Sequence, residues 1–262
     1  MVIPCIDMKI ILIGAGNLAT RLAVALQKKG MTPAYIYSRT RESAEQLSER
    51  LRDVPHSTDI SRVPTDGDLY IFAVKDSALL DLVSRMSANR GLWVHTAGSM
   101  DMEVFAPYTA RYGVFYPMQT FSKERVTDFD DIPIFVEANH TNDTERLQEL
   151  AGRLSTKVYE ATSEQRKYLH LAAVFACNFT NHLYALCDRI LSEHGLPFET
   201  MLPLIRETAA KVADMPPEQA QTGPAIRYDK NVIDKQMALL SDPTMRQIYD
   251  LMSRSIHETN KH

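Results

Sequence analysis

One short stretch near the start of the chain has the residue types and spacing of a nucleotide-binding turn. Gly14 to Ala19 reads Gly-Ala-Gly-Asn-Leu-Ala and joins the apolar run Lys9 to Ile13 to a helical pattern. In such a unit the first glycine permits a tight turn, the second lets the backbone approach a pyrophosphate, and a small third residue allows close helix–strand packing. The free N–H groups and positive dipole end of the helix would then face the phosphates. The stretch predicts a dinucleotide site, and the alternative is a glycine turn in some other α/β protein. The predicted cofactor contacts here are Gly14, Ala15, Gly16, Asn17 and Leu18.

The residues after the next predicted strand, Ala34 to Tyr37, indicate which dinucleotide binds. NAD-type sites place Asp or Glu at this point, where the carboxylate binds the ribose hydroxyls. This chain has Ser38 and Arg39 instead, followed by Thr40. A carboxylate would repel a 2′-phosphate, whereas a guanidinium can bind it bidentately or stack on the adenine. The sequence therefore favours NADP over NAD, and the alternative is that Arg39 is a solvated surface charge.

Further polar residues follow three later strands, and they extend the predicted site. Val74 and Lys75 end one strand and are predicted cofactor contacts, with a solvated Lys75 as the alternative. His95 to Ser99 follows the next strand, where a nicotinamide would lie. Here we predict Thr96 at the cofactor, Ser99 at the substrate and His95 in proton transfer, with a turn histidine bonded to nearby backbone as the alternative. After a further strand, Tyr116, Gln119 and Thr120 are candidates for binding substrate polar groups.

A second group of candidates lies on one predicted helix, residues 164–191. At about 100° per residue, His170, Asn178 and Asn181 fall within roughly 80° of one another. His170 is the best general acid or base, because an unperturbed imidazole titrates near pH 6.5; Asn178 joins it as a catalytic candidate and Asn181 as a substrate contact. The alternative is a set of satisfied polar groups at a domain or subunit interface. Arg227 is predicted to hold a substrate carboxylate, with a surface pair to Asp229 as the alternative.

The predicted elements determine how these residues could be positioned. Apolar runs predict strands at 9–13, 34–37, 68–74, 91–94, 112–116, 132–137 and 157–159, with helices between them. A short third strand is expected to end at 56–58. After residue 162 only helical patterns occur, at 164–191, 198–213, 229–240 and 244–257. The sequence thus predicts an α/β fold with a Rossmann-type, doubly wound, mainly parallel sheet in residues 1–161, and an all-helical second domain in residues 162–262. Ligands of such sheets bind outside the carboxyl ends of the strands.

Composition excludes several function classes. The net charge of −4 over 262 residues gives no basic footprint for nucleic acid. The apolar runs are too short for a membrane span, and the first ten residues do not resemble an export signal. The three cysteines, Cys5, Cys177 and Cys187, lack metal-ligand spacing, and no clustered carboxylates or His motif indicate a metal. We therefore expect a cytoplasmic protein without a metal site.

Several motifs together carry a resemblance to a known superfamily. They are Gly14 to Ala19, Ser38-Arg39, Ala73 to Asp76, His95 to Ser99, Tyr116 to Phe121, His170 to Val174 and Thr222 to Pro224. The chain resembles the two-domain reductases in which a Rossmann domain precedes a helical domain of the 6-phosphogluconate-dehydrogenase type, such as pyrroline-5-carboxylate reductase and the β-hydroxyacid dehydrogenases. It is more closely similar to bacterial proteins usually called putative NADP oxidoreductases, whose helical C-terminal domain has no assigned function. The resemblance implies a C-terminal domain of that type and points to a homodimer formed through it.

One residue departs from the superfamily pattern. The hydroxyacid dehydrogenases use a lysine three residues before an asparagine as acid or base, and Phe175 stands there relative to Asn178. A phenylalanine cannot transfer a proton, which counts against simple hydroxyacid dehydrogenation.

The motifs together predict an NADP-dependent oxidoreductase that transfers a hydride between nicotinamide and a carbonyl or imine of a small polar metabolite in an interdomain cleft. The alternative is a non-catalytic NADP-binding sensor or partner protein. A third possibility, an adenosyl-methionine methyltransferase, fits poorly with Ser38 and Arg39.

Overall fold

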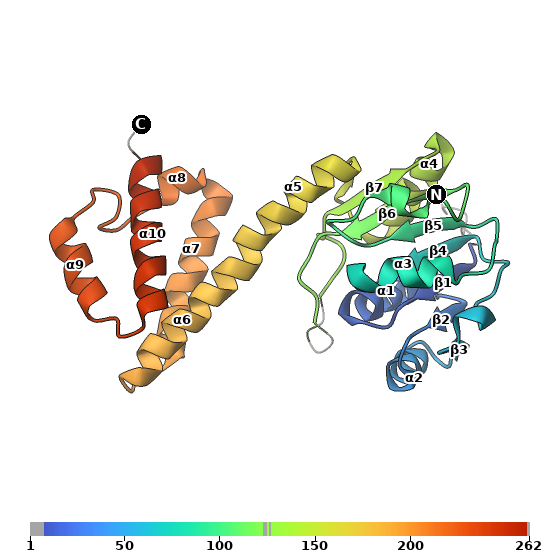
Figure 1. Cartoon of the computed structure of the whole chain (residues 1–262), viewed down its shortest axis with the longest axis horizontal. Helices are drawn as coiled ribbons and strands as arrows, with labels where there is room; N and C mark the ends of the chain where they lie inside the picture. The colour runs from blue at the N-terminus through green and yellow to red at the C-terminus, as the bar shows by residue number, and fades with distance from the viewer. Residues whose placement is uncertain (1–7, 123–124, 126, 261–262) are drawn as a thin grey trace. The chain divides into compact units, whose positions relative to one another are not determined.

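The structure is a computed structural model that describes residues 8–122, 125 and 127–260 (Figure 1). The chain divides into two compact units, Met1–Cys177 and Asn178–His262, and each is described here by itself. The predicted boundary between residues 161 and 162 marks the change from strands to helices, and it stays a prediction. Cys5 lies outside the described residues, whereas Cys177 and Cys187 are free thiols. Within the described part of the chain, no helix has the length and apolar character needed to cross a bilayer.

The first unit is built on an eight-stranded sheet within the described residues. The strands are β1 (Ile10–Ile13), β2 (Tyr35–Tyr37), β3 (His56–Ser57), β4 (Leu69–Phe72), β5 (Leu92–His95), β6 (Tyr112–Pro117), β7 (Ile134–Ala138) and β8 (Val158–Glu160). Their spatial order is β3-β2-β1-β4-β5-β6-β7-β8, and only the β6–β7 pair is antiparallel. The first six strands have the order of a dinucleotide-binding Rossmann sheet. The predicted fold class is therefore confirmed.

Both faces of this sheet are buried, because alternate strand residues enter two different cores. Ile10 and Leu12 of β1 belong to the core that contains apolar residues of α1, α2 and α4, whereas Ile11 and Ile13 belong to the core that contains those of α3. The helices are α1 (Asn17–Lys28), α2 (Arg41–Arg50), α3 (Asp76–Ser84) and α4 (Thr141–Leu154). Side chains of a strand alternate between faces, so a strand apolar at every position must be covered on both sides.

The order of the strands also determines where a ligand can bind. Strand β1 pairs with β2 on one side and with β4 on the other, so the connections that follow β1 and β3 lead to opposite sides of it. Sheets of this type bind ligands at that point of reversal, outside the carboxyl ends of the strands. The turn that starts at Gly14 follows β1 directly and therefore lies at this point.

Helical residues run from Ser163 to Glu193 in three segments, α5 (Ser163–Ala173), a π-helical stretch (Val174–Phe179) and α6 (Thr180–Glu193). A single regular helix over residues 164–191 was predicted. Because a π-helix closes its hydrogen bonds over five residues instead of four, the spacing of about 100° per residue does not hold across that stretch. The α-helical spacing that predicted one stripe of His170, Asn178 and Asn181 therefore does not apply.

The second unit is helical, as predicted, within the described residues. Besides α6 it contains α7 (Leu202–Asp214), α8 (Pro217–Ala220), α9 (Lys230–Ala238) and α10 (Pro243–Thr259). The predicted helix at 198–213 begins with a 3₁₀ turn, Phe198–Met201, before α7. Asp242 caps α10 by accepting from the N–H groups of Thr244 and Met245, and it also pairs with Arg189 of α6.

Candidate functional site

A pocket of about 480 Å³ opens at the carboxyl ends of β1, β2 and β4. All of the predicted cofactor residues except Leu18 and Thr96 line it. The lining residues are Gly14, Ala15, Gly16, Asn17, Tyr37, Ser38, Arg39, Thr40, Ser43, Ala73, Val74, Lys75, Ser77, Ala78, Asp81, Leu82 and Arg85. A pocket of this size is within the range of cofactor sites. The structure thus brings together residues from three βα turns that the sequence had linked only by pattern.

The two glycines of the first turn have different geometric roles. Gly14 has a φ of +121°, and a Cβ there would lie 2.3 Å from the carbonyl oxygen of Ala73, so only glycine fits. Gly16 precedes α1, and a Cβ added to it would meet no atom within 4 Å. The space above Gly16 is therefore open. A pyrophosphate could approach this backbone and the unpaired N–H groups at the start of α1, so the turn fits the phosphates of a dinucleotide.

The end of β2 supplies the groups that would meet the ribose. Ser38 is buried, whereas Arg39 and Thr40 are exposed at the pocket. Arg85, which follows α3, also lines this pocket and forms an ion pair with Asp81 at 3.3 Å. Burial raises the pKa of the Tyr37 hydroxyl, and the charges of Arg85 and Arg39 act on the same group in the opposite direction. The sequence did not indicate Arg85 or Asp81, because nothing local marks a helix end as part of a cofactor site.

Asn17 uses its side chain within the protein. Its Nδ2 donates to the carbonyl oxygen of Phe121 at 3.0 Å, and Nε of Arg21 donates to the carbonyl oxygen of Ser122 at 2.9 Å. These bonds fasten the segment after β6 to the first turn of α1. Asn17 therefore remains available to a cofactor mainly through its backbone N–H.

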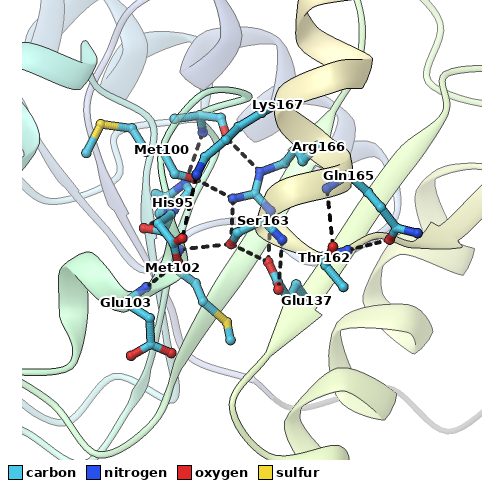
Figure 2. A network of polar contacts seen from close by, with 12 residues as sticks. His95, Met100, Met102, Glu103, Glu137, Thr162, Ser163, Gln165, Arg166 and Lys167 are labelled. Atoms are coloured by element: carbon cyan, nitrogen blue, oxygen red, sulfur yellow. Dashed lines mark hydrogen bonds and ion pairs between the residues drawn. The ribbon is translucent and has the colours of Figure 1, made fainter.

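The loop after β5 is held by Arg166, a residue that the sequence analysis did not single out (Figure 2). Its side chain is fully buried and forms an ion pair with Glu137 of β7 at 2.9 Å. The guanidinium also donates to the carbonyl oxygens of Ala97 and Met100 and to the hydroxyl of Ser163. No local signal marks Arg166, since its partners Ala97 and Glu137 lie 69 and 29 residues away.

Two further bonds of Glu137 attach the same loop and strand to the start of α5. The Glu137 carboxylate accepts from the N–H of Ser163 at 2.9 Å and from its hydroxyl at 2.7 Å. The hydroxyl of Ser163 accepts in turn from the N–H of Met102 at 3.1 Å, and Lys167 lies 3.8 Å from Asp101. Thr162 and Gln165 close a capping box at the same helix end. The start of α5 is thereby fixed against the ends of β5 and β7.

His95 lies under this loop and is 1% exposed. Its Nδ1 accepts from the N–H of Ala97 at 3.2 Å, and its Nε2 lies 3.3 Å from the carbonyl oxygen of Asp101. Burial, followed by the charge of Arg166, lowers the pKa of His95 to about 4. Both ring nitrogens thus contact backbone, which is the arrangement that the sequence left as the alternative to catalysis. A buried ring held in this way is suited to a structural role.

His170 of α5 lies beside the same loop, and its side chain is accessible. A Cβ added to Gly98 would lie 2.6 Å from Nδ1 of His170, so this position must remain glycine for the ring to sit there. The hydroxyl of Tyr116, in β6, is 3.2 Å from the same nitrogen. The ends of β5 and β6 and the α5 helix therefore surround one accessible imidazole at the sheet edge that carries the cofactor pocket.

The other predicted residues are placed as follows. Thr96 is buried and its N–H donates to the carbonyl oxygen of Phe72 at 3.2 Å. The hydroxyl of Ser99 donates to the Asp76 carboxylate. Gln119 and Thr120 are both exposed, and the side-chain oxygen of Gln119 accepts from the N–H of Thr120 at 2.8 Å. The remaining candidates, Asn178, Asn181 and Arg227, are exposed residues of the second unit, and their roles stay predictions.

A Rossmann sheet with an open glycine turn at its reversal point, followed by a helical unit, defines the class of two-part nucleotide-binding α/β proteins. Residues 3–118 match the family described as a Rossmann-like domain, and residues 132–256 match a domain of unknown function, DUF2520. No curated protein matches the chain.

Solved structures give the family directly. The putative NADP oxidoreductase of Bacteroides fragilis is 52% identical, with a TM-score of 0.90 over 96% of this chain and 98% of that one. The chain belongs to the family of this protein. The reductive aminase of Aspergillus terreus, solved with NADPH and ethyl levulinate, is 17% identical, with a TM-score of 0.73 over 97% of this chain and 95% of that one. Pyrroline-5-carboxylate reductase of Coxiella burnetii is 15% identical, with a TM-score of 0.60 over 97% of each chain. The last two likenesses show the fold. The predicted similarity to putative NADP oxidoreductases whose C-terminal domain has no assigned function is confirmed.

The buried His95 predicts a specific pH dependence of stability. Its pKa is near 6.5 when unfolded and about 4 when folded, so between those values the unfolded chain binds the additional proton. Stability therefore falls as pH falls through this window, by roughly 2–3 kcal/mol between pH 7 and 4.5. Urea unfolding at several pH values should show this slope for the native chain and a shallower one for His95→Gln. His56→Gln, which removes an exposed histidine, serves as the control. Identical slopes for the native chain and His95→Gln would contradict the assignment.

Proposed function

We propose that the protein is an NADP-dependent oxidoreductase that acts on a carbonyl or imine group of a small polar metabolite. The observation that carries this proposal is the pocket at the reversal point of the sheet, where the open Gly16 turn and Arg39 line one space. The 52% identical Bacteroides fragilis protein is named as an NADP oxidoreductase, which supports the same cofactor.

The residues present fit the cofactor in two places. The backbone of Gly14 to Asn17 would hold the pyrophosphate, and Arg39, with the hydroxyls of Ser38 and Thr40, would bind the ribose 2′-phosphate. Lys75 and Arg85 add further cations at the same pocket. When bound, the nicotinamide supplies or accepts the hydride.

On the substrate side, the proposal assigns proton transfer to His170. The imidazole is accessible, contacts Gly98 and lies beside the loop that follows β5. A general acid must be within hydrogen-bond reach of the atom it protonates, and it must exchange its proton near neutral pH. In the direction of reduction, His170 would give a proton to the oxygen or nitrogen of the substrate. Ser99, Gln119 and Thr120 remain candidate substrate contacts after β5 and β6. Asn181 and Arg227 are the candidates in the second unit.

Phe175 favours a second candidate function. If Asn178 corresponds to the asparagine of the hydroxyacid dehydrogenases, as the resemblance implies, Phe175 stands where those enzymes have a proton-transferring lysine. A phenyl ring cannot transfer a proton. A protein that binds NADP and has lost catalysis, acting as a sensor or a partner, would have the same pocket. Turnover separates this candidate from the first.

We also propose that the chain forms a homodimer through its helical unit, which resembles the C-terminal domain type of 6-phosphogluconate dehydrogenase. Large apolar side chains of this unit are exposed, among them Leu204 at 62%, Leu239 at 81% and Leu251 at 63%. An apolar groove of about 440 Å³ lies between α6, α9 and α10. Exposed apolar surface of this extent is typical of protein–protein contact.

Removing the Arg39 guanidinium should weaken NADPH binding selectively. Hydrogen bonds to charged groups contribute about 1.5–3 kcal/mol, so Arg39→Ala should raise the Kd for NADPH about 10- to 150-fold. The Kd for NADH should change less than about three-fold on the same scale. Calorimetric titration measures both values, and Arg41→Ala, which removes a neighbouring exposed arginine paired with Glu45, is the control. Equal losses for the two nucleotides would show that Arg39 does not recognise the 2′-phosphate.

Loss of His170 should reduce turnover and leave nucleotide binding intact. A positioned acid or base contributes typically 10²- to 10⁴-fold, so His170→Gln should lower kcat by about this factor while the Kd for NADPH stays the same. NADPH oxidation against a panel of carbonyl compounds and imines provides the assay, with His56→Gln as the control. Unchanged kcat removes His170 from catalysis. NADPH binding by the native chain without turnover on any substrate of the panel would support the sensor.

The proposed dimer is tested by its mass. Analytical ultracentrifugation at micromolar concentration should give twice the 29.7 kDa of the chain. A single species at the mass of one chain would contradict the proposal.

A further inference from the structure

The Tyr116 hydroxyl has a buried position that the proposed function does not use. The residue is 8% exposed, in β6, and packs among Val114, Phe135 and Ala161. A tyrosine hydroxyl in such surroundings usually has a hydrogen-bond partner. Here the partner is Nδ1 of His170 at 3.2 Å, with the two rings edge to face and their centroids 6.4 Å apart. The two residues thus form a pair in which only the imidazole is accessible.

The electrostatics of the pair keep the hydroxyl protonated at neutral pH. Burial raises the pKa of Tyr116; the Cys177 thiol acts in the same direction, and the guanidinium of Arg166 acts against them. A protonated hydroxyl can both donate and accept. It can therefore donate to Nδ1 of a neutral imidazole and accept from the Nδ1–H of an imidazolium.

Packing holds the imidazole in this position. The ring lies against Gly98, where a Cβ would be 2.7 Å from its Cγ. Gly98 belongs to the loop that Arg166 binds through the carbonyl oxygens of Ala97 and Met100. Because Arg166 and His170 are four residues apart on α5, they share one side of the helix. The helix, the loop and the β6 hydroxyl thereby restrict the ring together.

We propose that Tyr116 is a positioning residue that binds Nδ1 of His170 and leaves Nε2 as the nitrogen that exchanges a proton with the substrate. This inference rests on the proposed function for its catalytic meaning, but the contact itself can be tested without turnover. It assigns a role to a residue that the sequence indicated only as a candidate for binding substrate polar groups.

His170 would exchange one proton with the substrate, at Nε2. In reduction, the Nε2–H bond of the His170 imidazolium breaks, its electron pair stays on Nε2, and the proton goes to the substrate oxygen or nitrogen as the hydride adds to carbon. The neutral imidazole keeps its other proton on Nδ1. This Nδ1–H group donates a hydrogen bond to the Tyr116 oxygen. Solvent then returns a proton to Nε2. Oxidation runs through the same groups in reverse.

The direct test is nuclear magnetic resonance of the full chain with ¹⁵N-labelled histidine, at a pH where His170 is protonated. The Nδ1–H signal of His170, assigned by its loss in His170→Gln, should be visible and exchange slowly with water. In Tyr116→Phe this signal should be lost or exchange at least about ten-fold faster, because a hydrogen bond to a charged group has been removed. Tyr112→Phe is the matched control, since that hydroxyl lies in the same strand and bonds to Glu103 at 2.8 Å instead.

Turnover gives the second readout. Tyr116→Phe should lower kcat by about ten-fold or more and change the pH dependence of kcat, with the Kd for NADPH unchanged, whereas Tyr112→Phe should match the native chain. The melting temperature of each variant shows whether it is folded. A folded Tyr116→Phe protein that keeps the protected Nδ1–H signal overturns the inference, whatever its activity. If Tyr116→Phe loses the Nδ1–H signal but the native chain reduces no substrate, the contact is supported. That result counts only against the proposed function.

Discussion

The buried charge of Arg166 is the constraint on which the rest of the site depends. A guanidinium removed from water needs an opposite charge and hydrogen-bond partners for its three nitrogens, because desolvation of an unpaired ion costs several kcal/mol. Glu137, two backbone carbonyls of the β5 loop and the Ser163 hydroxyl meet this need. Removing one partner of such a pair typically costs about 3–5 kcal/mol. Strand β7, the β5 loop and the start of α5 must therefore keep one fixed arrangement.

That arrangement gives the sheet edge two ends with different chemistry. At one end, the Gly14 turn and the groups after β2 form an open pocket suited to phosphates. At the other end, the fixed loop holds His95 beneath it as a neutral, buried ring, and His170 beside it as an accessible one. The two histidines thus differ because of their surroundings: His95 is enclosed, whereas His170 is accessible. A dinucleotide placed along this edge would have its adenosine near Arg39 and its nicotinamide near His170.

Much of the fold could be predicted from the sequence because it follows from local rules. Strands that are apolar at every position must be covered on both faces. The turn after β1 needs a positive φ at residue 14, and glycine adopts this conformation without strain. The pocket residues at the strand ends could be predicted from the same pattern, whereas Asp81 and Arg85 at the end of α3 could not. The antiparallel β7 was not predicted, because its apolar run is compatible with either direction.

The parts that the sequence could not give depend on distant contacts. Arg166 looks like a surface charge until its distant partners are known, since Glu137, Met100 and Ala97 lie 29, 66 and 69 residues away. The burial of His95 depends on the same loop. The sequence pattern alone is therefore compatible with either a catalytic or a structural role for this residue. The π-helical stretch at Val174–Phe179 changes the angle per residue within the long helix. Side-chain directions predicted from regular α-helical spacing therefore do not hold beyond it.

A crystal structure of the chain with NADPH tests the central claim most directly. The account predicts the 2′-phosphate at Arg39, the pyrophosphate on the backbone of Gly14 to Asn17, and the nicotinamide against the Thr96–Ser99 loop on the side of His170. A nucleotide bound elsewhere, or a nicotinamide directed away from His170, would contradict it.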